Sequence, residues 1–280
     1  MGGLLYLGSG VGLSVGRLLR DGGWKASGLA KGEWPWLLGA IFFGGIVAPV
    51  ALLSGLTRIS GSTASLLLNL EAVLTAAIAW VVFKENADRR VVLGMAAIVA
   101  GGVVLSWPSS ATGTAEWVGP TLIAAACACW AIDNNLTRKG AASDALFIAG
   151  SKGLVTGVFN TLLAITFGAS LPGVLTVSAT LLLGFFGYGL SLVLFVLALR
   201  GLGTARTGAH FSVAPFVGAA VAIGVLGEGA TQALWLAATL MAVGVWLHLT
   251  EHHAIFTRTT PRPMNTATRM TSTTSTLTTW

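Results

Sequence analysis

A single carboxylate stands in the middle of a nearly unbroken apolar run. The run extends from Ser60 to Phe83 over 24 residues, and Glu71 is its one charge. A bilayer core needs about 20 apolar residues, so the run predicts a membrane-spanning helix. A carboxylate at mid-membrane costs about 2.5–3.5 kcal/mol on insertion scales, and such residues usually face a bundle interior or a wet cavity. Glu71 is therefore a candidate functional residue; the alternative is a neutral carboxyl hydrogen-bonded to a neighbouring helix.

The overall composition points the same way. The chain is 54% hydrophobic and 9% charged, whereas soluble domains carry about 25% charged residues. This predicts an integral all-α polytopic membrane protein. The net charge of +6 resembles that of a nucleic-acid binder, but the basic residues follow the membrane segments, so no nucleic-acid partner is expected.

Hydrophobic runs predict nine spans with short linkers. They cover residues 4–20, 36–56, 60–83, 91–107, 118–137, 146–167, 176–199, 207–227 and 231–249. With the loop after the first span placed inside, 14 of the 16 Lys and Arg residues lie on the inner side, and only Arg58 lies outside. This satisfies the positive-inside rule. We therefore expect a protein of the cell (inner or plasma) membrane with a cytoplasmic C-terminus.

The chain also repeats itself at an offset of 143 residues. Phe42-Phe43-Gly44 matches Phe185-Phe186-Gly187, and Glu85 matches Glu228. The repeat predicts two halves, residues 1–107 and 118–249, followed by a polar tail, 250–280, whose composition predicts disorder. The 118–137 span has no partner in the first half, which predicts five-helix halves with the first of ten helices missing and a reading frame that extends upstream. An odd number of spans per half would make the repeat inverted.

Three stretches resemble EamA-type permeases of the drug/metabolite transporter superfamily. The first, from Gly55 to Glu85, is similar to the fourth helix of that family, and Ala214 to Glu228 is similar to the ninth. The third, Cys129 to Arg138, resembles the sixth helix of one branch. The resemblance covers roughly residues 4–249. It implies that the 118–137 helix lines a central cavity and that the protein exports amino acids or similar metabolites.

Three charges lie within predicted spans: Glu71, Asp133 and Lys152. Asp133 lies roughly 6 Å and Lys152 roughly 9 Å from the inner edge of two consecutive helices. Opposite charges at similar depth predict an ion pair. The candidate residues for substrate binding or coupling are Glu71, Asp133, Asn134, Lys152, Asn69 and Trp130.

Other kinds of site have little support in the sequence. The thiols of Cys127 and Cys129 point about 200° apart on a helix, so neither a disulfide nor a metal site is predicted. No cofactor is expected. A membrane enzyme would need clustered ligands or a nucleophile with its base within the spans, and none is evident, so we predict that the protein is not an enzyme.

The most consistent hypothesis is secondary transport of a small metabolite by alternating access. No ATP-binding motif is evident, so an ion, most plausibly a proton carried by Glu71 or Asp133, would couple the transport. A drug-type exporter of organic cations is the nearest alternative, because a carboxylate among aromatic rings suits a cation. A non-transporting membrane subunit and a homodimer are left open. The expected partners are therefore a small-molecule substrate, a coupling ion and the lipid bilayer.

Overall fold

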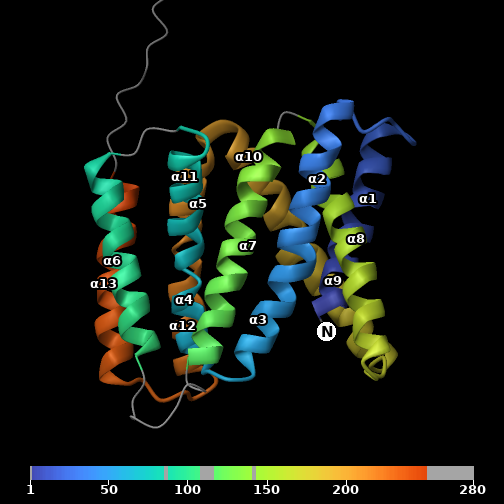
Figure 1. Cartoon of the computed structure of the whole chain (residues 1–280). Coiled ribbons are helices and arrows are strands. Elements are labelled where there is room, and N and C mark those ends of the chain that lie inside the picture. Colours follow the sequence, from blue (N-terminus) through green and yellow to red (C-terminus); the bar gives the residue numbers. More distant parts are fainter. Residues whose placement is uncertain (1, 85–87, 108–116, 141–142, 251–280) are drawn as a thin grey trace, which may run out of the picture.

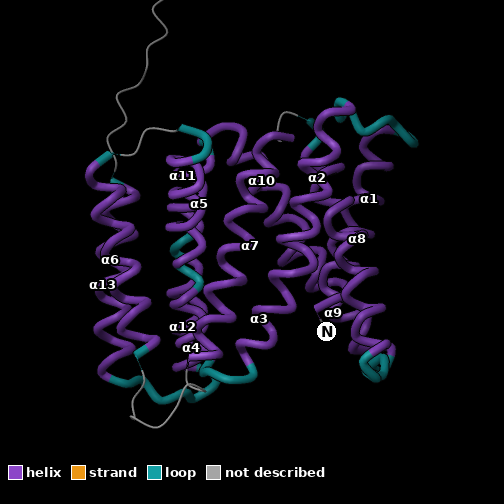
Figure 2. Tube along the Cα trace, in the orientation of Figure 1, coloured by secondary structure: helices purple, strands orange, loops and turns teal. Residues whose placement is uncertain are grey.

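The protein is a bundle of helices that stand side by side (Figure 1). The computed structural model describes residues 2–84, 88–107, 117–140 and 143–250, and the regular structure within these ranges is helical throughout (Figure 2). The described residues form nine helical segments, four of them divided internally: α1 (Gly2–Asp21); η1 (Lys31–Glu33), α2 (Trp34–Ala40), η2 (Ile41–Val47) and α3 (Ala48–Leu56); α4 (Gly61–Leu67) and α5 (Leu70–Val81); α6 (Arg89–Ser106); α7 (Val118–Gly140); α8 (Ala145–Thr166); α9 (Val174–Leu183), η4 (Gly184–Leu190) and α10 (Ser191–Leu202); α11 (Thr204–Phe211) and α12 (Ala214–Gly224); and α13 (Gln232–Leu249). The predicted disordered tail, apart from Thr250, lies outside the described residues.

Seven of these segments are long and apolar enough to cross a membrane, by length and composition. The two segments outside this group are α1 and α7. The first carries six glycines and Arg17, and the second carries the polar run Asp133-Asn134-Asn135. The chain is an integral membrane protein of the all-helical class, and the prediction of nine spans is met by length and composition for seven segments.

The bounds of the helices repeat at the offset that relates the sequence halves. Two π-helical stretches, η2 and η4, begin and end 143 residues apart. The same offset relates both ends of α6 to those of α13, and the first residue of α1 to that of α8. The repeat therefore extends from residue types to irregularities of the backbone.

Glycines let α1 pack tightly between α8 and the α9–η4 region. A Cβ on Gly153 would lie 2.6 Å from the Gly10 backbone nitrogen, and a Cβ on Gly8 would overlap the backbone of Leu181. Small residues of this kind allow helix backbones to approach closely in lipid. Gly16 has no atom within 4 Å of the position of a Cβ, so it does not contribute to this packing.

Gly153→Val is expected to lower the free energy of unfolding by at least about 1–3 kcal/mol, because the atoms it would meet belong to backbone and cannot move aside. Gly16→Ala is the matched control in α1. It should be neutral or stabilising by about 0.5–1 kcal/mol, since alanine is favoured over glycine inside a helix. Thermal unfolding of both variants in detergent measures the difference. Equal stabilities would show that the close approach of α1 and α8 is dispensable.

Two helices that were predicted to be continuous are interrupted. Turns at Leu68–Asn69 separate α4 from α5, and turns at Ser212–Val213 separate α11 from α12. At the first break, Asn69 Nδ2 donates to the Leu66 carbonyl at 3.1 Å, so a side chain competes with the helical backbone bonds. At the second, Pro215 cannot donate to the carbonyl four residues earlier. The two interrupted helices contact each other, α4 against α12 and α5 against α11.

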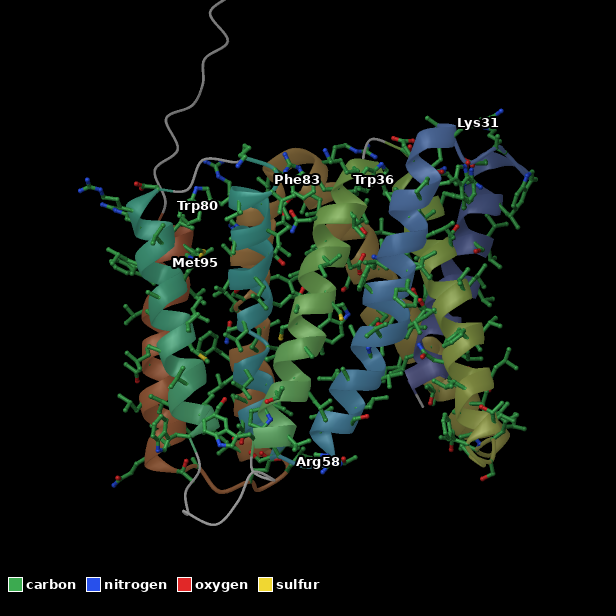
Figure 3. The ribbon with its side chains drawn as sticks, in the orientation of Figure 1. Lys31, Trp36, Arg58, Trp80, Phe83 and Met95 are labelled. Carbon is green, nitrogen blue, oxygen red and sulfur yellow. The ribbon has the colours of Figure 1, made fainter. Side chains whose placement is uncertain are left out.

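Charged side chains hold the two ends of the bundle. The carboxyl of Asp144, before α8, accepts from Arg17 Nε at 2.9 Å and from Arg20 Nη2 at 2.6 Å. Burial by itself would raise the pKa of Asp144, but the hydrogen bonds from Arg20 and Arg17 lower it to about 2. Lys31 and Arg58 lie at opposite ends of the bundle (Figure 3), as the predicted topology requires.

The far end of α12 is tied to the start of α4. The two carboxyl oxygens of Glu228 accept from the backbone nitrogens of Gly61 and Ser62, each at 2.8 Å. Hydrogen bonds from the Ser62 side chain and from these backbone groups lower the pKa of Glu228. Residues 167 and 166 positions apart in sequence thus connect the two halves at this end.

Candidate functional site

A cavity of about 360 Å³ lies among the helices of both halves. The first half contributes residues from α1, η2, α3 and α5, and the second half from α7, α8, η4, α10 and α11. Five of the six predicted site residues line it: Glu71, Trp130, Asp133, Asn134 and Lys152. A volume of 300–1,000 Å³ is typical of small-molecule sites.

The predicted ion pair between Asp133 and Lys152 is confirmed. Lys152 Nζ donates to Asp133 Oδ1 at 2.6 Å, and both side chains are only 8% exposed. Thr137 joins them: its hydroxyl donates to Asp133 Oδ1 at 2.8 Å and accepts from Lys152 Nζ at 3.1 Å. The pair lies between α7 and α8, at the depth where each charge would otherwise face hydrocarbon unpaired.

Glu71 is held more loosely than Asp133. Asn134 Nδ2 donates to Glu71 Oε1 at 2.9 Å and is 3.2 Å from the Thr75 hydroxyl. Asn135 Nδ2 donates to the Thr75 carbonyl at 3.1 Å. Neighbouring amides of α7 therefore fix α5, and Glu71 receives one side-chain hydrogen bond among the described residues.

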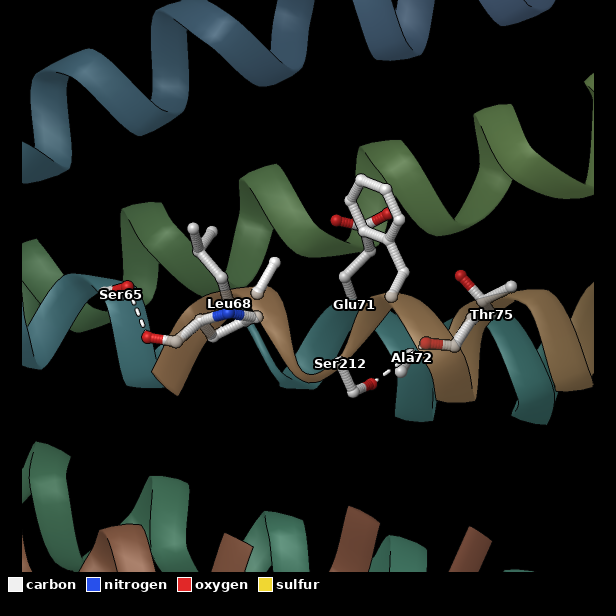
Figure 4. Close-up of a pocket in the computed structure, with 10 residues that line it drawn as sticks. Ser65, Leu68, Glu71, Ala72, Thr75 and Ser212 are labelled. Atoms are coloured by element: carbon white, nitrogen blue, oxygen red, sulfur yellow. Dashed lines mark hydrogen bonds between the residues drawn. The ribbon is translucent and has the colours of Figure 1, made fainter. Parts of the chain in front are cut away.

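Glu71 also lines a second cavity, of about 180 Å³, between the two interrupted helices (Figure 4). Ser65 and Ser212 border this cavity; their hydroxyls donate to the carbonyls of Pro215 at 2.7 Å and Gly208 at 3.0 Å. The two cavities share Leu68, Glu71 and Phe211. The Glu71 carboxyl thus stands where the cavities adjoin.

Pro49 explains how Trp130 is positioned. Proline has no N–H, so it cannot donate to the Gly44 or Gly45 carbonyls at the end of the π-helical stretch η2. Trp130 Nε1 donates to the Gly44 carbonyl at 3.0 Å, and Asn160 Nδ2 donates to the Gly45 carbonyl at 2.8 Å. Side chains of the second half therefore replace the missing backbone donors of the first.

Asn69 is the predicted site residue that the structure places away from the others. It is buried at the helix break, where Nδ2 bonds to Leu66 and lies 3.9 Å from Met241 Sδ of α13. It is absent from the lining of both cavities described above.

Sequence analysis missed three residues that line the larger cavity: Tyr6, Tyr188 and Thr156. The rings of Tyr6 and Tyr188 meet edge to face with centroids 4.9 Å apart. A signal was available, because these are the chain's only two tyrosines and both fall inside predicted spans. The described residues contain no group of three or more His, Cys, Asp or Glu side chains placed to hold a metal.

Comparisons with known proteins agree with the fold and the resemblance. Residues 4–107 match the profile of the EamA-like transporter family. An uncharacterized transporter of Methanothermobacter thermautotrophicus is 27% identical over 213 residues, which cover 72% of this chain and 60% of that protein. The chain thus spans less than two thirds of the length of this curated relative. One crystal structure shares the fold with a TM-score of 0.65 at 20% identity, covering 88% of this chain and 85% of the other.

Proposed function

Because residues 4–107 belong to the EamA-like transporter family, we propose that the chain is a secondary-active membrane transporter that exports a small metabolite such as an amino acid. The observation that carries the proposal is the position of Glu71, one carboxyl bordering two adjoining cavities in an otherwise apolar bundle. Intramembrane carboxylates that line cavities are typical of substrate and ion pathways.

Alternating access in this proposal comes from an inverted repeat of two five-helix halves. Three features support it: the common offset of the helix bounds, the paired π-helical stretches, and the two interrupted helices that pack on each other. In transporters built this way, the site lies at the repeat interface beside discontinuous helices, and one half moves against the other.

Proton coupling in this proposal is assigned to Glu71 rather than to Asp133. Asp133 Oδ1 already accepts from Lys152 and Thr137, so protonating it would break a buried ion pair. Glu71 accepts from a neutral amide and can gain a proton without losing a charged partner.

An exporter of organic cations is the second candidate. The favouring observation is that Glu71 shares its cavity with the aromatic rings of Tyr6, Tyr188 and Phe211. A carboxylate among ring faces attracts quaternary and other cations.

Purified protein in liposomes with an imposed pH gradient tests both candidates. We expect accumulation of one or more labelled amino acids that depends on the gradient and is abolished by a protonophore. Gradient-driven uptake of ethidium without uptake of amino acids would favour the cation exporter. Movement of neither class would contradict transport and favour a non-transporting subunit.

A further inference from the structure

Lys152 retains a hydrogen-bond donor that faces the larger cavity. An ammonium group has three N–H donors, and two are used by Asp133 Oδ1 and Thr137 Oγ1. The described part of the chain supplies no acceptor for the third, although the residue is only 6% exposed and lines the cavity. A ligand oxygen in the cavity would complete its coordination.

Thr156 stands one helical turn further along α8 and has the same need. The residue is fully buried, lines the same cavity, and its hydroxyl oxygen has no hydrogen-bond partner within the described residues. Buried polar atoms are nearly always bonded, so an unpartnered one calls for an explanation. Residues four apart lie on one helix face, about 6 Å apart along the axis. Lys152 and Thr156 therefore present two donors to the same space.

Glu71 offers the opposite chemistry in that cavity. An ionised carboxylate only accepts hydrogen bonds. Its Oε1 is used by Asn134, and Oε2 receives no donor from the described residues. Asp133 is not equivalent, because its Oδ1 carries Lys152 and Thr137 while its carboxyl packs against Gly44, where a Cβ would overlap it. Glu71 is the carboxylate with capacity left for a cationic donor.

We propose that this cavity recognises a zwitterion, a molecule bearing both a carboxylate and an ammonium group. The carboxylate is bound by Lys152 Nζ and the Thr156 hydroxyl, and the ammonium by Glu71. The proposal rests on the transport function above and names its substrate class. An amine without a carboxylate would leave Lys152 and Thr156 without acceptors, and buried donors left unsatisfied weaken binding.

The test uses purified full-length protein and three pools of compounds with the same side chains. One pool contains amino acids, the second the corresponding amines, and the third the corresponding acids without the amino group. We expect the amino-acid pool to bind about tenfold or more tightly than either of the others, as measured by titration calorimetry.

Thr156→Val removes one hydroxyl without changing the shape of the side chain. It should weaken binding of amino acids about tenfold and leave binding of amines unchanged. Thr161→Val is the matched control, because Thr161 is on the same helix, also has a buried hydroxyl without a partner among the described residues, and is not part of the cavity lining. It should bind all three pools as the unmodified protein does.

Amines that bind as tightly as amino acids would overturn the proposal, as would equal effects of the two threonine variants or binding of no pool. The same pools are then assayed for uptake into liposomes. Uptake of amines or acids alone would leave transport standing and refute zwitterion recognition. Binding of amino acids with no uptake of any pool would instead refute the transport function.

Discussion

Asp133→Asn and Lys152→Met are each expected to lower the free energy of unfolding by about 3–5 kcal/mol, because each leaves an unpaired charge in a buried site. The pair joins α7 to α8 at 2.6 Å with both side chains 8% exposed. The double variant should recover much of the loss, since removing both charges of a buried pair can be nearly neutral. Folded yield in detergent and thermal unfolding measure all three variants.

Arg20→Met is the matched control for Lys152→Met. Arg20 is also paired with a carboxylate, at 2.6 Å from Asp144, but its side chain is 49% exposed. Exposed pairs contribute about 0–1 kcal/mol, so its loss should be small. Strictly additive losses in the double variant would show that Asp133 and Lys152 do not stabilise each other.

Glu71→Gln is expected to abolish uptake driven by a pH gradient while sparing exchange of substrate across the membrane. Glutamine keeps the shape of the side chain and can still accept from Asn134, which donates to Glu71 Oε1 at 2.9 Å. It cannot carry a proton at any accessible pH. Counterflow and gradient-driven uptake, compared in the same liposomes, separate the two effects.

Glu228→Gln controls for the loss of a carboxylate elsewhere on the same interrupted helix. Glu228 bonds to the backbone at the start of α4 and lines neither cavity described here. It should retain the response to the gradient. A Glu71→Gln protein that still accumulates substrate in response to the gradient would reduce Glu71 to a packing residue.

The helical class and the central pair could be predicted from the sequence because depth and charge are one-dimensional properties. Counting residues from the ends of two apolar runs placed Asp133 and Lys152 at similar depth, and the structure pairs them. The position of Asn69 could not be predicted in this way. Its helix is broken at Leu68–Asn69 without a glycine or proline, so the faces before and after the break do not follow one continuous helical period.

The joining of the two cavities at Glu71 was equally beyond sequence patterns. It depends on Phe211, which precedes the second break, and on the way the interrupted helices pack. Thr156 gave no signal because a threonine in a membrane helix usually bonds to its own backbone. Only the three-dimensional structure shows that its hydroxyl has no such partner among the described residues.

The absence of one N–H at Pro49 makes three distant positions a single unit for protein engineering. Replacing Pro49 with alanine would supply a backbone donor that competes with Trp130 and Asn160 for the Gly44 and Gly45 carbonyls. Replacing either of those side chains alone would strand a carbonyl inside the bundle, at a cost typical of a lost buried hydrogen bond. Attempts to straighten this helix, or to widen the cavity at Trp130, therefore have to change positions 49, 130 and 160 together.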